Sequence, residues 1–215
     1  GFHDSSSALI PYLINFHEPF VLISTGTWCI TMNPFAETQL TEMELHQDCL
    51  CYMTYDGTPV KASRLFAGYE HEIQAKKIAD YYAVAASKFR SIEIDWDIIA
   101  SLTLAGTSGD LHAFAKRDLT SFAGYVEAYH TLIYDLVQAQ VQATKLVLPT
   151  NGTKRIFVDG GFSKNSLYMN LLAHSFPAME VYAASMAQAT ALGAALAIHG
   201  HWNTQPIPAD IIGLK

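Results

Sequence analysis

The chain has 215 residues, of which 50% are hydrophobic and 12% aromatic, with a formal net charge of -7. This composition supports a sizeable buried core and argues against intrinsic disorder. The 13 Lys and Arg residues form no basic run, so we expect no nucleic-acid partner. No apolar stretch approaches the roughly 20 residues of a membrane span, and no signal-peptide pattern is evident, so we expect a cytoplasmic protein without a membrane partner.

The first third of the chain predicts a helix followed by two hairpins. A short amphipathic helix is expected over 5–15, with Asp4 or a following serine as its cap. Apolar strands over 20–24 and 28–32 flank a glycine turn, which predicts the first hairpin. A second hairpin is expected from 48–55 and 59–62. Core packing is expected for the three cysteines, Cys29, Cys49 and Cys51, because their number and spacing suit neither a disulfide framework nor a metal site.

Helical periodicity dominates the middle of the chain. It predicts a helix over 70–89 and a short helix over 96–102 with Asp95 as its cap. A loop follows at 106–109. Apolar residues recurring at i, i+3, i+4 and i+7 then predict a long helix that opens at Asp118 or Thr120 and runs to about Thr144.

The last third alternates strands and helices. A strand over 155–158, a tight turn at 159–161 and a helix over 165–175 come first. A strand over 180–182 and an alanine-rich helix over 187–199, closed by Gly200, follow. Hairpins followed by strand–turn–helix units predict a single α/β domain over 1–215 with a mixed sheet.

Three segments could carry chemistry. Asp4, at a helix start among serines, could accept a proton from a substrate hydroxyl or simply cap the helix. The turn at 24–27 (STGT) could present backbone N–H groups to a phosphate or be an ordinary hairpin turn. The segment 157–165 (FVDGGFSKN) places two glycines between a strand and a helix, which suits a nucleotide's phosphates, although a plain turn remains an alternative. No Walker A motif or G-x-G-x-x-G motif is present.

The order of these segments resembles the C-terminal domain of the FGGY carbohydrate kinases, the family of glycerol kinase, xylulokinase, rhamnulokinase and fuculokinase. Four stretches carry the resemblance: 1–8 (GFHDSSSA), 23–28 (ISTGTW), 158–165 (VDGGFSKN) and 187–195 (AQATALGAA). The resemblance implies an actin/Hsp70-like, ribonuclease-H-like ATPase domain with a mixed sheet flanked by helices. It also implies ATP and Mg²⁺ as cofactors and a sugar as the small-molecule substrate.

The resemblance also implies roles for individual residues. Asp4 would be the catalytic base that deprotonates the sugar hydroxyl. Gly26 and Thr27 would contact the transferred phosphate. The two glycines Gly160 and Gly161 would line the α-phosphate and ribose.

The resemblance also concerns the contact with the adenine base and the identity of the sugar substrate. Asn165 falls where relatives place an adenine contact. Gln188 stands where relatives often have Glu, which removes a charge. Thr27 and Trp28 together resemble rhamnulokinase-like and fuculokinase-like members, which favours a 6-deoxy-ketohexulose as the substrate.

Full-length members of this family are about twice as long as this chain. The resemblance therefore implies that an N-terminal sugar-binding domain, which supplies the magnesium ligands and most of the sugar pocket, is absent. We expect the chain alone to be inactive and to associate, for example as a homodimer, through the apolar face that would meet that domain. A nucleotide-binding module without catalysis and an α/β domain whose glycine turns are only turns remain the alternatives.

Overall fold

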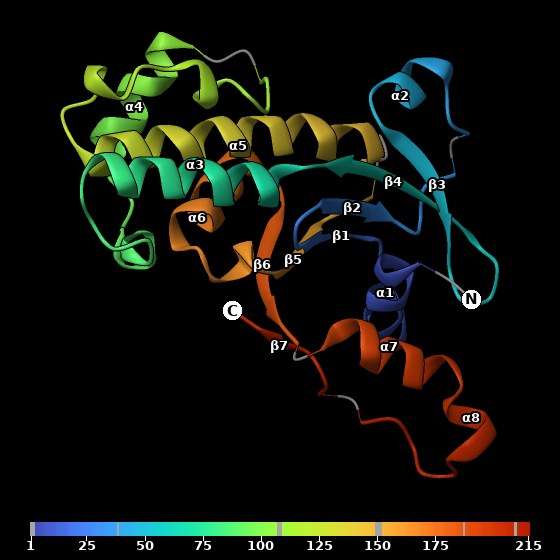
Figure 1. Cartoon of the computed structure of the whole chain (residues 1–215). Coiled ribbons are helices and arrows are strands. Elements are labelled where there is room, and N and C mark those ends of the chain that lie inside the picture. The colour runs from blue at the N-terminus through green and yellow to red at the C-terminus, as the bar shows by residue number, and fades with distance from the viewer. Residues whose placement is uncertain (1–2, 38, 107–108, 149–151, 187, 209) are drawn as a thin grey trace.

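The computed structural model describes residues 3–37, 39–106, 109–148, 152–186, 188–208 and 210–215. The sheet has the strand order β3-β4-β2-β1-β5-β6-β7, and helices cover both of its faces (Figure 1). The strands are β1 (Phe20–Thr25), β2 (Cys29–Asn33), β3 (Cys49–Met53), β4 (Pro59–Leu65), β5 (Arg155–Gly160), β6 (Glu180–Ser185) and β7 (Gly213–Leu214).

The α-helices are α1 (Asp4–Asn15), α2 (Glu42–His46), α3 (Ala67–Tyr81), α4 (Trp96–Ala105), α5 (Tyr125–Val147), α6 (Ser166–Ser175), α7 (Ala189–Ala197) and α8 (His199–Trp202). Four 3₁₀ turns complete the described structure: η1 (Lys88–Ser91), η2 (Phe114–Lys116), η3 (Leu119–Ser121) and η4 (Phe162–Lys164). No described helix has both the length and the apolar character needed to cross a bilayer.

Strand directions confirm the mixed sheet. β1, β5 and β6 run parallel, whereas the β1–β2, β2–β4 and β3–β4 pairs are antiparallel. Thr25 at the end of β1 pairs with Gly160 at the end of β5. The turns that follow these two strands therefore leave the sheet side by side at the same edge.

Side chains alternate along β1 and divide the core in two. Val21 and Ile23 belong to the larger cluster, with residues of α3, α5 and α6, and Phe20 and Leu22 to the smaller one, with residues of α1. Accordingly, α3, α5 and α6 lie on one side of the sheet, and α1 and α7 lie on the other (Figure 1).

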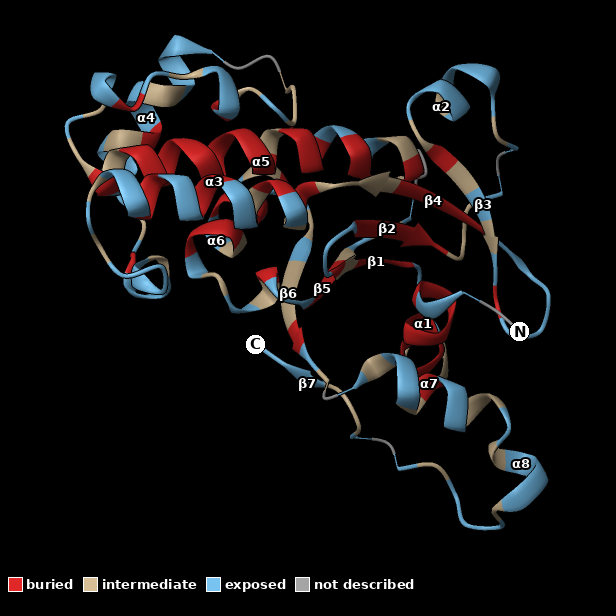
Figure 2. Cartoon of the chain, in the orientation of Figure 1, coloured by how far each residue is buried: buried red, intermediate tan, exposed pale blue. Residues whose placement is uncertain are grey.

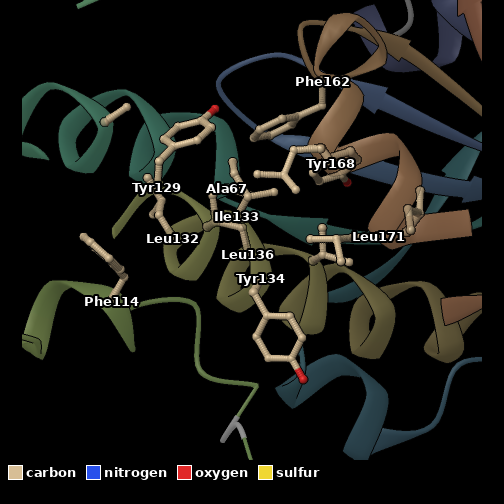
Figure 3. Packing of buried hydrophobic residues seen from close by; sticks show 14 of the residues in the cluster. Ala67, Phe114, Tyr129, Leu132, Ile133, Tyr134, Leu136, Phe162, Tyr168 and Leu171 are labelled. Carbon is tan, nitrogen blue, oxygen red and sulfur yellow. The ribbon is translucent and has the colours of Figure 1, made fainter. Parts of the chain in front are cut away.

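Helix α5 forms the centre of the larger cluster. Its apolar positions recur at helical spacing, and most of its length is buried (Figure 2). Figure 3 shows Tyr129, Leu132 and Ile133 of α5 beside Ala67 of α3 and Phe162 of η4. This packing fixes α3 and η4, which flank the turns after β1 and β5, against one rigid helix.

The expected hairpins and the Asp95 cap are confirmed, but several boundaries were predicted incorrectly. Helix α3 ends at Tyr81 because Ala83 adopts a left-handed conformation with φ of 52°. The long helix begins at Tyr125, after an extended Gly124, and Asp118 caps η3 instead. Asp118 therefore opens a separate turn.

Two smaller expectations also need correction. Gly200 lies inside α8 and does not close the alanine-rich helix, which ends at Ala197. Cys29 and Cys49 are buried as expected, whereas Cys51, which lies on the edge strand β3 together with Cys49, is exposed. The short strand β7, which pairs antiparallel with β6, was not predicted.

Candidate functional site

Two glycine turns meet at the edge of the sheet, and Thr25 connects them. The Thr25 carbonyl accepts a hydrogen bond from the Gly161 N–H at 2.8 Å. Its hydroxyl donates to the Asp159 carbonyl at 2.5 Å and accepts from the Phe162 N–H at 3.0 Å. Because Thr25 is only 5% exposed, these bonds are shielded from water and hold the two turns in register.

The two glycines of the second turn have different structural roles. Gly160 has φ of +92°, and a Cβ there would lie 1.9 Å from the Thr25 carbonyl oxygen, so the fold itself requires glycine. Gly161 has φ of -65°, and the nearest atom to an added Cβ would be 3.9 Å away. Gly161 is exposed, so its lack of a side chain leaves an open backbone surface that the fold does not need.

The first turn is exposed at Gly26 and Thr27 and is supported from behind by α3. The Tyr69 N–H donates to the Thr27 carbonyl at 3.1 Å. A Cβ at Gly68 would lie 1.8 Å from the Gly26 carbonyl oxygen, so the backbones of α3 and the turn are in close contact. No described residue forms a hydrogen bond with the Thr27 hydroxyl, which is therefore available to a ligand.

An aromatic cluster borders the first turn. The ring of Trp28 lies 4.4 Å from that of Phe66, which stacks on Tyr69 at 4.6 Å. The Arg64 guanidinium lies 5.3 Å above the Trp28 ring and is held by an ion pair with Asp48 at 2.6 Å. This arrangement places an ordered aromatic and cationic surface directly beside Thr27.

Asp4 is exposed and is the first residue of α1. The expectation that it caps the helix is wrong, because the ring Nδ1 of His3 accepts the Ser5 N–H at 3.2 Å. No hydrogen bond to a described residue occupies the Asp4 carboxylate, and no described contact joins it to either glycine turn. Gly1 and Phe2, which belong to the same sequence motif, lie outside the described residues.

Asn165 is partly exposed and caps α6. Its Oδ1 accepts the Tyr168 N–H at 3.2 Å, and its Nδ2 donates to the Tyr129 hydroxyl at 2.8 Å. The structure thus gives Asn165 a defined orientation four residues after Gly161. A groove of about 580 Å³ between α6 and β6, lined in part by Ser163 and Lys164, adjoins the same turn.

Sequence reasoning assigned no role to two residues at the centre of the site, Thr25 and Asp159. Asp159 is 7% exposed, and burial raises the pKa of its carboxyl, an effect opposed by the Gly160 N–H, which donates to Oδ1 at 2.7 Å. The buried Tyr12 hydroxyl lies close to this carboxyl without completing a regular hydrogen bond. Their positions at the ends of β1 and β5, next to glycines, were the available signal.

The structure therefore brings Gly26 and Thr27 together with Gly160 and Gly161, and Asn165 caps the helix that follows the second turn. No described contact joins Asp4 to this group. Within the described part of the chain, no group of three His, Cys, Asp or Glu residues is arranged to hold a metal ion. The site offers exposed backbone N–H groups, the Thr27 hydroxyl, and Gly161, a glycine that the fold itself does not require. These groups suit an elongated anion better than a metal ion.

Solved structures with a similar fold include carbohydrate, xylulose and glycerol kinases. A carbohydrate kinase from Novosphingobium aromaticivorans is 22% identical, with a TM-score of 0.65 over 100% of this chain and 45% of its own. A ligand-bound xylulose kinase from Lactobacillus acidophilus is 12% identical, with a TM-score of 0.65 over 97% of this chain and 44% of its own. Plasmodium falciparum glycerol kinase with ADP is 15% identical, with a TM-score of 0.59 over 94% of this chain and 42% of its own.

The fold is thus an α/β domain, with a mixed sheet flanked by helices, that matches less than half of each of these kinase chains. The family model for the C-terminal domain of FGGY carbohydrate kinases matches residues 17–206. The chain belongs to this family, and it spans less than half the length of the kinases it resembles. A comparison with curated proteins returns no match. The family match covers both glycine turns and Asn165 but begins after Asp4.

Proposed function

We propose that this chain is the nucleotide-binding domain of an ATP-dependent sugar kinase that phosphorylates a hydroxyl group of a ketose or polyol. The observation that carries the proposal is the pairing of two exposed glycine turns through the buried Thr25. FGGY kinases use ATP, and the glycerol kinase that this chain resembles was solved with ADP. The open backbone at Gly161 is where a phosphate could approach closely.

The proposed roles follow the order of the atoms along a bound nucleotide. Gly160 and Gly161 would line the α-phosphate and ribose, and Asn165 the base. Gly26 and the Thr27 hydroxyl would contact the phosphoryl group that is transferred. Catalysis of this transfer rests mainly on positioning and on electrostatic stabilisation of the phosphate oxygens.

Asp4 would act as the base in the transfer step. Its carboxylate would take the proton of the sugar hydroxyl as that oxygen bonds to the γ-phosphorus and the bond to ADP breaks. A carboxylate without a hydrogen-bond partner among the described residues suits this role. Mg²⁺ would bind mainly through the nucleotide phosphates and a second domain, as the family resemblance implies.

The partner and the location of the protein follow from the same proposal. The related kinases are longer than the part that this chain matches. In the proposal, the unmatched part corresponds to the sugar-binding domain. The resemblance of Thr27 and Trp28 to rhamnulokinase-like and fuculokinase-like members favours a 6-deoxy-ketohexulose among the ketoses. ATP and sugar phosphates are cytoplasmic metabolites, so we expect the protein to act in the cytoplasm.

Replacement of Gly161 by alanine tests the proposal. Gly161 already has a helical conformation with room for a Cβ, so Gly161→Ala should leave stability unchanged or raise it by up to about 1 kcal/mol. If the nucleotide phosphates contact this backbone, the added methyl group should weaken ADP binding roughly tenfold or more. Calorimetric titration with ADP and urea unfolding measure the two effects.

Gly200→Ala is the matched control, because a Cβ at Gly200 also meets no atom within 4 Å. This variant should bind ADP like the wild-type chain. The proposal is wrong if the wild-type chain does not bind ADP, or if Gly161→Ala binds it as tightly as Gly200→Ala does.

A second candidate function is nucleotide binding without catalysis. It is favoured by one observation, which is that no described contact joins Asp4 to either glycine turn. Both candidates predict ADP binding at the glycine turns. They differ in whether a sugar is phosphorylated.

A further inference from the structure

The hydrogen bonds around Asn165 have a determined direction. The Asn165 Oδ1 accepts the Tyr168 N–H, so the other end of the amide, Nδ2, must face the Tyr129 hydroxyl. An amide nitrogen can only donate, so the Tyr129 oxygen accepts this bond. The proton of the Tyr129 hydroxyl is then free to be donated elsewhere.

His71 is the acceptor for that O–H. Its Nε2 lies 3.0 Å from the Tyr129 oxygen, and among the described residues no other group can accept from this buried hydroxyl, so Nε2 accepts the hydrogen bond. His71 must therefore be neutral, with its proton on Nδ1. Burial agrees with this state, because it lowers the pKa of His71 to about 4.

The surroundings of these side chains hold them in place. Tyr129 is fully buried, and the His71 ring packs edge-to-face against Phe89 at 5.2 Å and Phe162 at 5.3 Å. Phe162 follows Gly161 directly, and the His71 ring that it contacts also lies 6.0 Å from the Tyr129 ring. The same cluster therefore supports both the Gly161 turn and the Asn165 amide.

We infer that Tyr129 and His71 are positioning residues that fix the Asn165 amide for recognition of the nucleoside part of the nucleotide. The inference rests on the function proposed above. One N–H of Asn165 and one lone pair of its carbonyl oxygen remain unused by the described contacts, and Asn165 is partly exposed. A fixed amide of this kind can form hydrogen bonds with a purine edge or a ribose hydroxyl without losing rotational freedom on binding.

Tyr129→Phe tests the inference, because it removes the hydroxyl and keeps the ring. The variant should bind ADP about three- to tenfold more weakly, as expected when a positioned neutral hydrogen bond is lost. Tyr125→Phe is the matched control. Tyr125 lies on the same helix one turn earlier, and its buried hydroxyl has no hydrogen-bond partner among the described residues. Removal of that hydroxyl should not change ADP affinity.

A double variant distinguishes positioning from general stability. If Tyr129 acts through Asn165, Tyr129→Phe should cause no further loss of affinity when Asn165 is already alanine. Additive losses would overturn the inference. In addition, long-range ¹H–¹⁵N spectra of the wild-type chain should show His71 neutral, with Nε2 unprotonated, at pH 7. A proton on Nε2 would also overturn it.

The two proposals fail in different ways. If the wild-type chain does not bind ADP, the proposed function fails, and the positioning inference fails with it. If the wild-type chain binds ADP and Gly161→Ala weakens binding, but Tyr129→Phe has no effect, only the positioning inference is wrong.

Discussion

At the scale of single residues, hydroxyl groups connect parts of the site that are far apart in sequence. Thr25 reaches Asp159 and Phe162, and Tyr129 reaches Asn165 and His71. Each oxygen donates one hydrogen bond and accepts at least one other, so each fixes two neighbours at once. A buried hydroxyl with both functions satisfied is costly to remove, because its partners lose their bonds inside the protein.

His71 leads to a prediction about acid stability. Its pKa is about 4 in the folded chain and 6.5 when unperturbed, so between these values the unfolded chain binds a proton that the folded chain does not. This contribution to stability is present above about pH 6.5 and is lost as the pH falls toward 4, by roughly 3 kcal/mol at most. Urea unfolding between pH 7 and 4.5 measures it.

The control for this prediction is His71→Gln, which has no titrating group at this position. The variant should lose less stability than the wild-type chain over the same pH range. Equal losses in both proteins would show that His71 does not titrate as its burial indicates.

The residue roles could be predicted from sequence only where a motif is local. The glycine turns were found because a strand, a glycine and a hydroxyl lie next to one another in the chain. Thr25, Asp159 and Tyr129 were not assigned, because their partners lie on other elements and nothing local marks them. For Asp4 the cap alternative was wrong, since His3 supplies the acceptor; its catalytic role remains a prediction.

At the scale of elements, the contact between α1 and α7 depends on one glycine. A Cβ at Gly193 would lie 1.8 Å from the Ser7 carbonyl oxygen, and the Ser7 hydroxyl donates to the Thr190 carbonyl at 2.6 Å. The two helices are therefore in backbone contact, and a larger residue at this position must displace the backbone of α1 or α7. Because α1 begins with Asp4, this contact also restrains the proposed base.

Gly193→Ala should destabilise the chain. Alanine alone would favour the helix by up to about 1 kcal/mol over glycine, but the methyl group must displace backbone on α1. We expect a net loss of roughly 1–3 kcal/mol and faster amide hydrogen exchange in α1 and α7. Gly200→Ala is the control, since nothing lies within 4 Å of its added Cβ. A Gly193→Ala variant as stable as wild type would contradict the close contact.

The elements that were predicted best are those whose ends are set by residues with strong turn preferences. Both hairpins were found because a glycine turn at 25–27 and an Asp56-Gly57 turn interrupt apolar strands. The long helix was found by its period, but its start was not, because apolar residues before Gly124 continue the pattern into η3. The left-handed Ala83 gives no sequence signal, so the end of α3 was missed as well.

At the scale of the whole molecule, one sheet edge gathers both glycine turns, and one helical layer supports them. The α/β class and the mixed sheet followed from the order of the elements, and the structure confirms both. The strand order could not be derived from the sequence, because β1 pairs with β5 across more than a hundred residues. Self-association through an exposed apolar face remains a prediction, which light scattering at high concentration can test.

The 215-residue chain should bind ADP but not phosphorylate sugars. The proposed base and phosphate turns are present, yet the chain corresponds to less than half of each related kinase described above. An assay of ADP release from ATP with ketoses, 6-deoxy-ketohexuloses and glycerol should therefore give background rates. Asp4→Asn is the control. Sugar-dependent turnover that is lost in Asp4→Asn would contradict the need for a second domain while supporting Asp4 as the base.

The stacking of Arg64 on Trp28 beside Thr27 gives the protein an intrinsic optical reporter. Trp28 is 41% exposed, and its indole is next to the residue proposed to meet the transferred phosphate. An anion bound there would change the electric field at the Trp28 indole ring and would also attract the Arg64 guanidinium that lies over this ring. Tryptophan emission should then follow ligand occupancy in real time without a label, and Trp28→Phe should abolish the signal although Trp96 and Trp202 still fluoresce.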